Sequence, residues 1–277
     1  CLVGSEMCIR DSNKLGAVVT KGVANVPWPG NPTPRIAETY GGMINAIGLQ
    51  NPGIDVFCER DIPFLKKYDT KIIVNVCGKS ERDYVEVVER LAGEPVDMLE
   101  INISCPNVKE GGIAFGQNAA NIEHITKAIK NVAKQPVIMK LSPNVTDITE
   151  MAKAAEAGGA DVLSLINTIT GMKIDINRQT FAVANKTGGL SGPAVKPVAV
   201  RMVYQVANAV KIPIIGMGGI ATAEDALEFI LAGATAVSIG TANFHNPRTT
   251  LEVIEGIEKY MVNKGVSDIN DLIGIVK

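Results

Sequence analysis

A single thiol lies between two carboxamides in the segment EINISCPN, where Cys105 stands between Asn102 and Asn107. Most lone cysteines are buried in the core, and on that basis we interpret Cys58 and Cys77 as structural. Cys105 differs because it follows an apolar run and is flanked by a serine and a proline, as in a loop that leaves a strand. A thiol in such a loop is suited to act as a general base or as a nucleophile.

Lysine and amide side chains follow other apolar runs. Lys21 stands in VVTKG and Lys140 in IMKLSPN, while Asn167 ends another run and Asn45 lies in NAIGLQN. A lysine at the end of an apolar strand is costly to desolvate, so each predicts a bound anion, a carboxylate partner or an exit to solvent. The two histidines lie in a predicted helix and in a late loop, which argues against Ser-His-Asp or Cys-His hydrolysis. We predict no metal site.

Two glycine-rich turns occur late in the chain, in GMGGI at 216–220 and in IGTA at 239–242. In (β/α)₈ barrels the loops after strands seven and eight bind phosphate, because glycine lets backbone N–H groups approach the anion closely. The serial positions of these turns favour a phosphate site. Two tight strand-to-helix turns without a ligand are the alternative.

The elements that must position these residues alternate regularly from Leu15 onward, as in a parallel sheet covered by helices. The predicted strands are Gly16–Thr20, Lys71–Val76, Asp97–Ile103, Val137–Leu141, Asp161–Ile166, Pro213–Met217 and Ala236–Ile239. The predicted helices are Glu81–Ala92, Ala119–Ala133, Ile148–Ala157, Val195–Val210, Ala223–Ala232 and Thr249–Asn263. Ser80 and Thr222 are the expected N-caps of two of these helices.

This alternation predicts an α/β fold, a (β/α)₈ TIM barrel lacking its first strand-helix unit. An open doubly wound sheet is the rival, but no GxGxxG follows the first strand. Two long excursions, Ala24–Phe57 and Thr168–Pro193, leave the carboxyl ends of strands, where barrel active sites are built. We expect them to be functional, although parts of both could be surface hairpins.

The first twelve residues, CLVGSEMCIRDS, show neither a strand nor a helix period and no features of a signal peptide. We therefore expect 1–12 to be a non-native segment and 13–277 to be a single barrel domain. On this interpretation the chain is a fragment whose first strand-helix unit belonged before Leu15.

The composition excludes several function classes. The chain has 277 residues, of which 46% are hydrophobic and 20% charged, and its formal net charge is -2. No basic field for nucleic acid is present, and the apolar runs are far shorter than a membrane-spanning helix needs. Five cysteines without CxxC spacing suggest no disulfide framework. A soluble protein of the reducing cytoplasm fits best.

A barrel with a phosphate site, two lysines, several amides and no metal needs a cofactor to complete its chemistry. Flavin mononucleotide (FMN) suits this pattern, with phosphate on the last two loops and donors around the ring, where reduced flavin accumulates negative charge. Pyridoxal phosphate or a phosphorylated substrate would use the same loops, so the residues alone leave these alternatives open.

The motifs NAIGLQNPG, EINISCPNVKEGG, IMKLSPN, LINTITGM, GGLSGPAVKP, GMGGI and IGTANF occur in this order from Asn13 to Lys277. In order and spacing they closely resemble the class 1 dihydroorotate dehydrogenases, and especially the catalytic subunit of the NAD-linked class 1B branch. The resemblance implies FMN-dependent oxidation of (S)-dihydroorotate to orotate in pyrimidine (UMP) biosynthesis. It also implies a homodimer within a heterotetramer, whose partner subunit carries FAD and a 2Fe-2S cluster and passes electrons to NAD.

The resemblance also implies roles for individual residues. Cys105 would be the base that removes the C5 proton while C6 gives hydride to flavin N5. The substrate-binding positions would be Lys21, Asn45, Gly48, Leu49, Asn102, Asn107, Asn167 and Thr168. The FMN-binding positions would be Lys21, Asn75, Asn102, Lys140, Gly192, Gly218, Gly219, Gly240 and Thr241, the last four of them around the phosphate.

The chain departs from the family at its front, where relatives have a first strand ending in an Ala-Ser-Gly turn against the flavin. Three alternatives stay open beside class 1B: a fumarate-linked class 1A enzyme, a dihydropyrimidine-oxidising module and a non-catalytic flavin-binding barrel. The residues NVKEGG after Cys105 favour class 1B.

Overall fold

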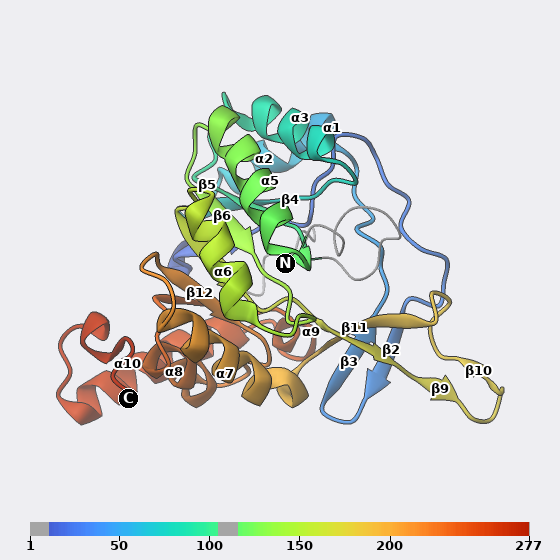
Figure 1. The fold of residues 1–277 in the computed structure, drawn as a ribbon. Coiled ribbons are helices and arrows are strands. Elements are labelled where there is room, and N and C mark those ends of the chain that lie inside the picture. Colours follow the sequence, from blue (N-terminus) through green and yellow to red (C-terminus); the bar gives the residue numbers. More distant parts are fainter. Residues whose placement is uncertain (1–10, 105–115, 277) are drawn as a thin grey trace.

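A computed structural model describes residues 11–104 and 116–276, and its centre is a curled parallel sheet of seven strands (Figure 1). The strands are β1 (Ala17–Val19), β4 (Lys71–Val76), β5 (Met98–Asn102), β6 (Val137–Lys140), β7 (Val162–Leu165), β12 (Ile214–Met217) and β13 (Ala236–Ser238). They pair in the order β1-β4-β5-β6-β7-β12-β13, so each is hydrogen-bonded to the next main-sheet strand along the chain. All seven predicted strands are present, and the barrel-type strand order is confirmed.

Five long helices connect these strands, a sixth follows β13, and together they cover the outer face of the sheet (Figure 1). They are α3 (Glu81–Leu91), α5 (Ala119–Val132), α6 (Ile148–Ala157), α7 (Lys196–Ala207), α8 (Ala223–Leu231) and α10 (Thr249–Lys264). The side chains of Ser80 and Thr222 each accept a hydrogen bond from the backbone N–H of the third helical residue, Asp83 or Asp225. The carboxylate of that aspartate accepts a hydrogen bond in return from the backbone N–H of the cap residue. Both predicted N-caps are therefore confirmed as capping boxes.

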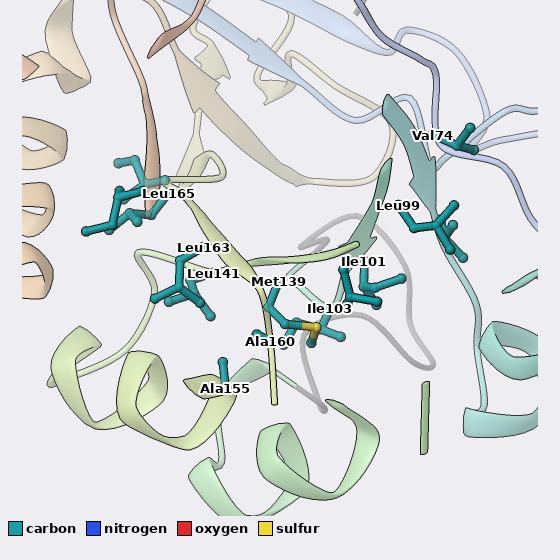
Figure 2. Packing of buried hydrophobic residues seen from close by; sticks show 14 of the residues in the cluster. Val74, Leu99, Ile101, Ile103, Met139, Leu141, Ala155, Ala160, Leu163 and Leu165 are labelled. Carbon is teal, nitrogen blue, oxygen red and sulfur yellow. The ribbon is translucent and has the colours of Figure 1, made fainter. Parts of the chain in front are cut away.

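The central strands β4 to β7 bury both of their faces, whereas the edge strands β1 and β13 are partly exposed. Leu99, Ile101, Met139 and Leu163 point toward the helices, where they join the main core (Figure 2). The alternate residues Ile73, Ile138 and Val162 pack with one another inside the sheet. Because side chains alternate along a strand, the polar residues Asn75, Glu100, Asn102 and Lys140 share this inner face, and the apolar inner cluster forms the floor beneath them.

The two long excursions pair with each other, which the sequence did not predict. The first contains β2 (Ile36–Thr39) and β3 (Gly42–Asn45), and the second contains β8 (Ile169–Met172) and β11 (Thr187–Ser191). They form an antiparallel sheet in the order β2-β3-β11-β8, which we call the excursion sheet, at one side of the barrel (Figure 1). A short hairpin, β9 (Ile174–Asp175) and β10 (Thr180–Phe181), extends from it.

Seven short helical segments complete the regular structure of the described residues. Those after the first excursion are α1 (Ile54–Val56), η3 (Phe57–Asp61) and α2 (Ile62–Leu65); the others are η2 (Ser12–Lys14), η4 (Pro193–Val195), α9 (Ala242–His245) and η5 (Ile269–Leu272). None was predicted, because a segment of three to five residues is too short to show a helical period.

The edge strands β1 and β13 are not paired with each other in the described residues, and both line a largely apolar pocket of about 320 Å³. The α/β class and the parallel barrel architecture are thus confirmed. The predicted boundary at residue 13 stays a prediction, since residues 1–10 lie outside the described part. Within that part, the helices are too short or too polar to cross a membrane.

Candidate active site

One pocket of about 470 Å³ gathers most of the predicted site residues at the carboxyl ends of the strands. Lys21 follows β1, Asn102 ends β5, Lys140 ends β6, and Asn167 follows β7. The predicted residues that line the pocket are Lys21, Asn45, Gly48, Leu49, Asn75, Asn102, Lys140, Asn167, Thr168, Gly240 and Thr241. Parallel strands end at the same edge of a sheet, so residues far apart in the sequence meet there.

The other predicted positions fall elsewhere. Gly192, Gly218 and Gly219 do not line this pocket, although all three have the positive φ that favours glycine. A Cβ on Gly219 would lie 2.8 Å from the backbone oxygen of Gly192, so the loops after β11 and β12 pack too closely for a side chain. Cys105 and Asn107 lie outside the described residues, which end at Ser104 and resume at 116.

A hydrogen-bond network anchored on Glu100 runs beneath the pocket. Glu100 is 1% exposed; its Oε1 accepts hydrogen bonds from Asn75 Nδ2 at 2.6 Å and from Lys140 Nζ at 3.1 Å. Its Oε2 accepts one from Ser164 Oγ at 3.1 Å. Asn102 Nδ2 donates to Asn75 Oδ1 at 3.3 Å, which extends the network to the pocket wall. Lys140 therefore has a carboxylate partner, which is one of the three outcomes predicted for its position.

The network continues through Asn167. Its Nδ2 donates to Asn102 Oδ1 at 3.2 Å and to Ser104 Oγ at 2.7 Å, while its Oδ1 accepts from the backbone N–H of Thr168 at 2.8 Å. The side-chain amides of Asn102 and Asn167, both predicted to contact substrate, are therefore held by each other and by Ser104. Ser104 directly precedes the predicted base, Cys105, in the sequence.

Sequence reasoning missed Glu100 and most of the apolar wall. Glu100 and Asn102 are two residues apart on β5, so the period of two of a strand already placed both on one face. The apolar wall includes Ile36 and Met43 from the excursion sheet and Phe244 from α9. No local signal predicted Ile36 or Met43, because the excursion sheet reaches the pocket through long-range pairing.

Tyr84 anchors the strand end that leads to Cys105. Its side chain is fully buried, and its hydroxyl donates to the backbone oxygen of Asn102 at 2.8 Å.

We expect Tyr84→Phe to lower the free energy of unfolding by about 1–2 kcal/mol, because the Asn102 carbonyl loses this donor in a buried site. Chemical denaturation measures the change. Tyr204→Phe is the control, since Tyr204 is partly exposed, and an equal loss in both variants would contradict this role.

Lys196 packs against the glycine turn after β12, where a Cβ added at Gly219 would lie 2.8 Å from the Cβ of Lys196. Its Nζ donates to Asp225 Oδ1 and Glu228 Oε1, both at 2.6 Å. Burial alone would raise the pKa of Asp225, but hydrogen bonds from Lys196 and from the backbone N–H groups of Ala221 and Thr222 outweigh it and lower that pKa.

The lowered pKa of Asp225 predicts a pH-dependent stability. The ionised carboxylate stabilises the folded state above its ordinary pKa of 3.8, and this contribution disappears as pH falls through the lower folded-state pKa. We expect Asp225→Asn to cost about 1–2 kcal/mol at pH 7, with the difference from wild type shrinking below about pH 4. Urea titrations at several pH values test this. Glu228→Gln should cost less because Glu228 is more exposed, and a pH-independent difference for Asp225→Asn would refute the assignment.

Cys58, Cys77 and the two histidines do not line the pocket. Cys58 and Cys77 are buried, and burial raises the pKa of the Cys58 thiol to about 11. His124 bonds Glu81 at 2.8 Å between α5 and α3, and His245 ends α9. Among residues 11–104 and 116–276, no three His, Cys, Asp or Glu side chains are grouped to hold a metal ion.

Comparison with known proteins assigns a family to this arrangement. A sequence profile described as dihydroorotate dehydrogenase matches residues 4–261. A protein of Lachnoclostridium phytofermentans named dihydroorotate dehydrogenase B (NAD(+)), catalytic subunit, is 76% identical over 96% of this chain and 89% of its own length. The protein of the same name from Alkaliphilus oremlandii is 65% identical over 95% of this chain and 87% of its own.

A solved structure shares the fold. The crystal structure of DHODH from Eimeria tenella in complex with ferulenol superimposes with a TM-score of 0.81 and 25% sequence identity. The match covers 95% of this chain and 79% of that one.

Proposed function

This chain belongs to the dihydroorotate dehydrogenase family, and we propose that its strand-end pocket binds FMN together with dihydroorotate. The chain is an oxidoreductase that converts dihydroorotate to orotate in pyrimidine biosynthesis, and its relatives of 76% and 65% identity are class 1B catalytic subunits. The observation that carries the proposal is the meeting of Lys140 and the amides Asn75, Asn102 and Asn167 in one pocket with an apolar wall.

The residues present fit a flavin. The pocket volume of about 470 Å³ lies in the range of small-molecule sites, which are mainly apolar with a few convergent polar groups. Ile36, Met43 and Phe244 supply apolar surface for a ring system. In the described residues, Lys140 donates to Glu100 alone, which leaves two of the three ammonium donors for a ligand.

The phosphate would lie over the loops after β12 and β13. Gly240 and Thr241 line the pocket, and an added Cβ at Gly240 would meet no atom within 4 Å, so this backbone stands in open space. In the turn after β12, Gly219 packs closely on Gly192 and Lys196, and Gly218 packs on Ala199 and Ile166. Backbone N–H groups at such glycines are suited to hold an anion.

Bound FMN supplies the hydride acceptor for C6 of dihydroorotate. The chain supplies the proton acceptor, and we assign this role to Cys105, whose thiolate would take the C5 proton. Asn102 and Asn167 would orient the substrate through their amides, which are held in fixed positions by Ser104 and by each other. These donors are neutral, which suits a reaction whose substrate and product carry the same carboxylate.

The electron acceptor is assigned from the relatives. Those compared are named NAD(+)-linked catalytic subunits, which favours class 1B over a fumarate-linked or dihydropyrimidine-oxidising enzyme. We propose that a partner subunit with FAD and a 2Fe-2S cluster passes electrons from this chain to NAD, in a heterotetramer built on a homodimer of this chain. Light scattering of the co-expressed subunits tests that assembly.

Anaerobic titration tests the function itself. The purified chain, reconstituted with FMN, should lose its flavin absorbance when dihydroorotate is added and should release orotate in a one-to-one ratio to flavin. Dihydrouracil is the control substrate, since it lacks the carboxylate. Bleaching by dihydrouracil at the same rate would favour the dihydropyrimidine alternative, and no bleaching by either would contradict the proposal.

A further inference from the structure

Glu100 is a buried charged residue on the inner face of the barrel, and the reaction proposed above gives it no role. It is 1% exposed and lies on the inner face of β5, above the apolar floor of Ile73, Ile138 and Val162. An unpaired carboxylate is costly in such surroundings, so its presence calls for an explanation.

Asn75, Lys140 and Ser164 all donate their hydrogen bonds to the carboxylate of Glu100. A carboxylate only accepts, so the Asn75 amide must turn its NH₂ group toward Glu100 and its oxygen toward Asn102. Asn102 then turns its NH₂ group to Asn75 and leaves its own oxygen for Asn167 and Ser104. The buried carboxylate therefore fixes which atoms these amides present at the pocket.

The charge of Glu100 also acts on the pocket. Lys140 Nζ lies 3.1 Å from Glu100 Oε1 and lines the pocket, with its side chain 16% exposed. At a ligand in the pocket, the positive potential of the ammonium is partly cancelled by the carboxylate behind it. Water screens this pair poorly, because the floor and the strands surround it.

We propose that Glu100 is a positioning residue that sets the electrostatic potential of the pocket and so the reduction potential of the bound flavin. This inference rests on the proposed function. A flavin gains negative charge on reduction, so a net positive pocket favours the reduced form. Glu100 holds Lys140 as a directed donor while cancelling part of its charge, and thereby keeps the flavin potential lower than Lys140 alone would set it.

The experiment measures flavin potentials in four proteins, each saturated with FMN and equilibrated anaerobically with a reference dye. Glu100→Gln removes the negative charge with little change in shape. It should raise the ratio of reduced to oxidised flavin at fixed dye potential by about tenfold or more, which is about 30 mV for a two-electron couple. Lys140→Met should lower that ratio, and the double variant should lie between the two single variants. Ser164→Ala is the matched control, since it removes a neutral hydrogen bond from the same carboxylate and should leave the ratio within about twofold of wild type.

The comparison is made in two backgrounds because Glu100→Gln alone could fail to fold. In that case the double variant must still show a higher ratio than Lys140→Met. A role limited to structure predicts lower thermal stability without a change of potential in either background, and that result would overturn the inference. Fluorescence titration of the apo-proteins with FMN separates the two proposals: failure of the wild-type chain to bind FMN contradicts the proposed function, whereas binding with unchanged potentials contradicts only the role of Glu100.

Discussion

Cys105→Ser should bind FMN normally and yet be reduced by dihydroorotate at least about a hundredfold more slowly than the wild type near pH 7. Near neutral pH a serine hydroxyl, unlike a thiol, is hardly deprotonated and so provides almost no anionic base, and general-base catalysis contributes on the order of 10²- to 10⁴-fold to a rate. Anaerobic stopped-flow reduction of the FMN-loaded protein isolates this step from electron transfer to the acceptor. A rate close to that of the wild type would remove Cys105 from the mechanism.

The matched control for this prediction is Cys58→Ala. Burial raises the pKa of the Cys58 thiol to about 11, so it is protonated at neutral pH, and it lies outside the pocket. Cys58→Ala should therefore leave the reduction rate within about twofold of wild type, although loss of the buried sulfur should cost some stability. A comparable loss of rate in both variants would point to a general effect of cysteine removal.

Lys140→Ala should have the second large effect, on both folding and cofactor binding. Glu100 is almost fully buried and would lose its charged partner, and breaking a buried ion pair costs about 3–5 kcal/mol. The pocket would also lose an ammonium donor, so we expect the dissociation constant for FMN to rise by about tenfold or more. Urea unfolding and fluorescence titration with FMN measure the two effects separately.

Lys130→Ala provides a control with similar chemistry. Lys130 Nζ donates to Asp161 Oδ2 at 2.6 Å, so it also pairs with a carboxylate, but it lies on α5 and does not line the pocket. Its removal should cost about 1 kcal/mol or less and leave the FMN dissociation constant unchanged. Equal FMN affinity in the Lys130 and Lys140 variants would contradict the assignment of Lys140 to the cofactor site.

The strands of the main sheet and the long helices could be predicted because the hydrophobic period and the end residues of each lie within its own local sequence. The strand Lys71–Val76 and the helix Ile148–Ala157 have the same bounds in sequence and structure, and both begin and end at strong local features. The excursion sheet was not predictable. Its pairing joins Asn45 to Gly189, and short strands rich in glycine give no indication of a partner so far along the chain.

The candidate site likewise contains residues that the sequence could predict and residues that it could not. Residues that follow a strand in the sequence, such as Lys21 and Asn167, were placed correctly at the strand-end pocket by the general rule for parallel barrels. Glu100 was missed because candidate residues were sought at strand ends, whereas Glu100 lies within β5 and is placed by the face of the strand that it occupies. Met43 was missed because only tertiary pairing brings it to the pocket.

The excursion sheet also determines when this protein can acquire its ligand during synthesis. Asn45 and Gly189 are 144 residues apart, and β3 cannot pair with β11 until the ribosome has released the later strand. At about 5–20 residues per second, translation alone separates the two strands by roughly 7–30 seconds. During that interval the wall that contains Met43 lacks its partner strand, and closing so long a loop is slow even in the finished chain. The pocket that we propose for the cofactor is therefore completed only after β11 has emerged, and we expect cofactor capture to occur late in synthesis.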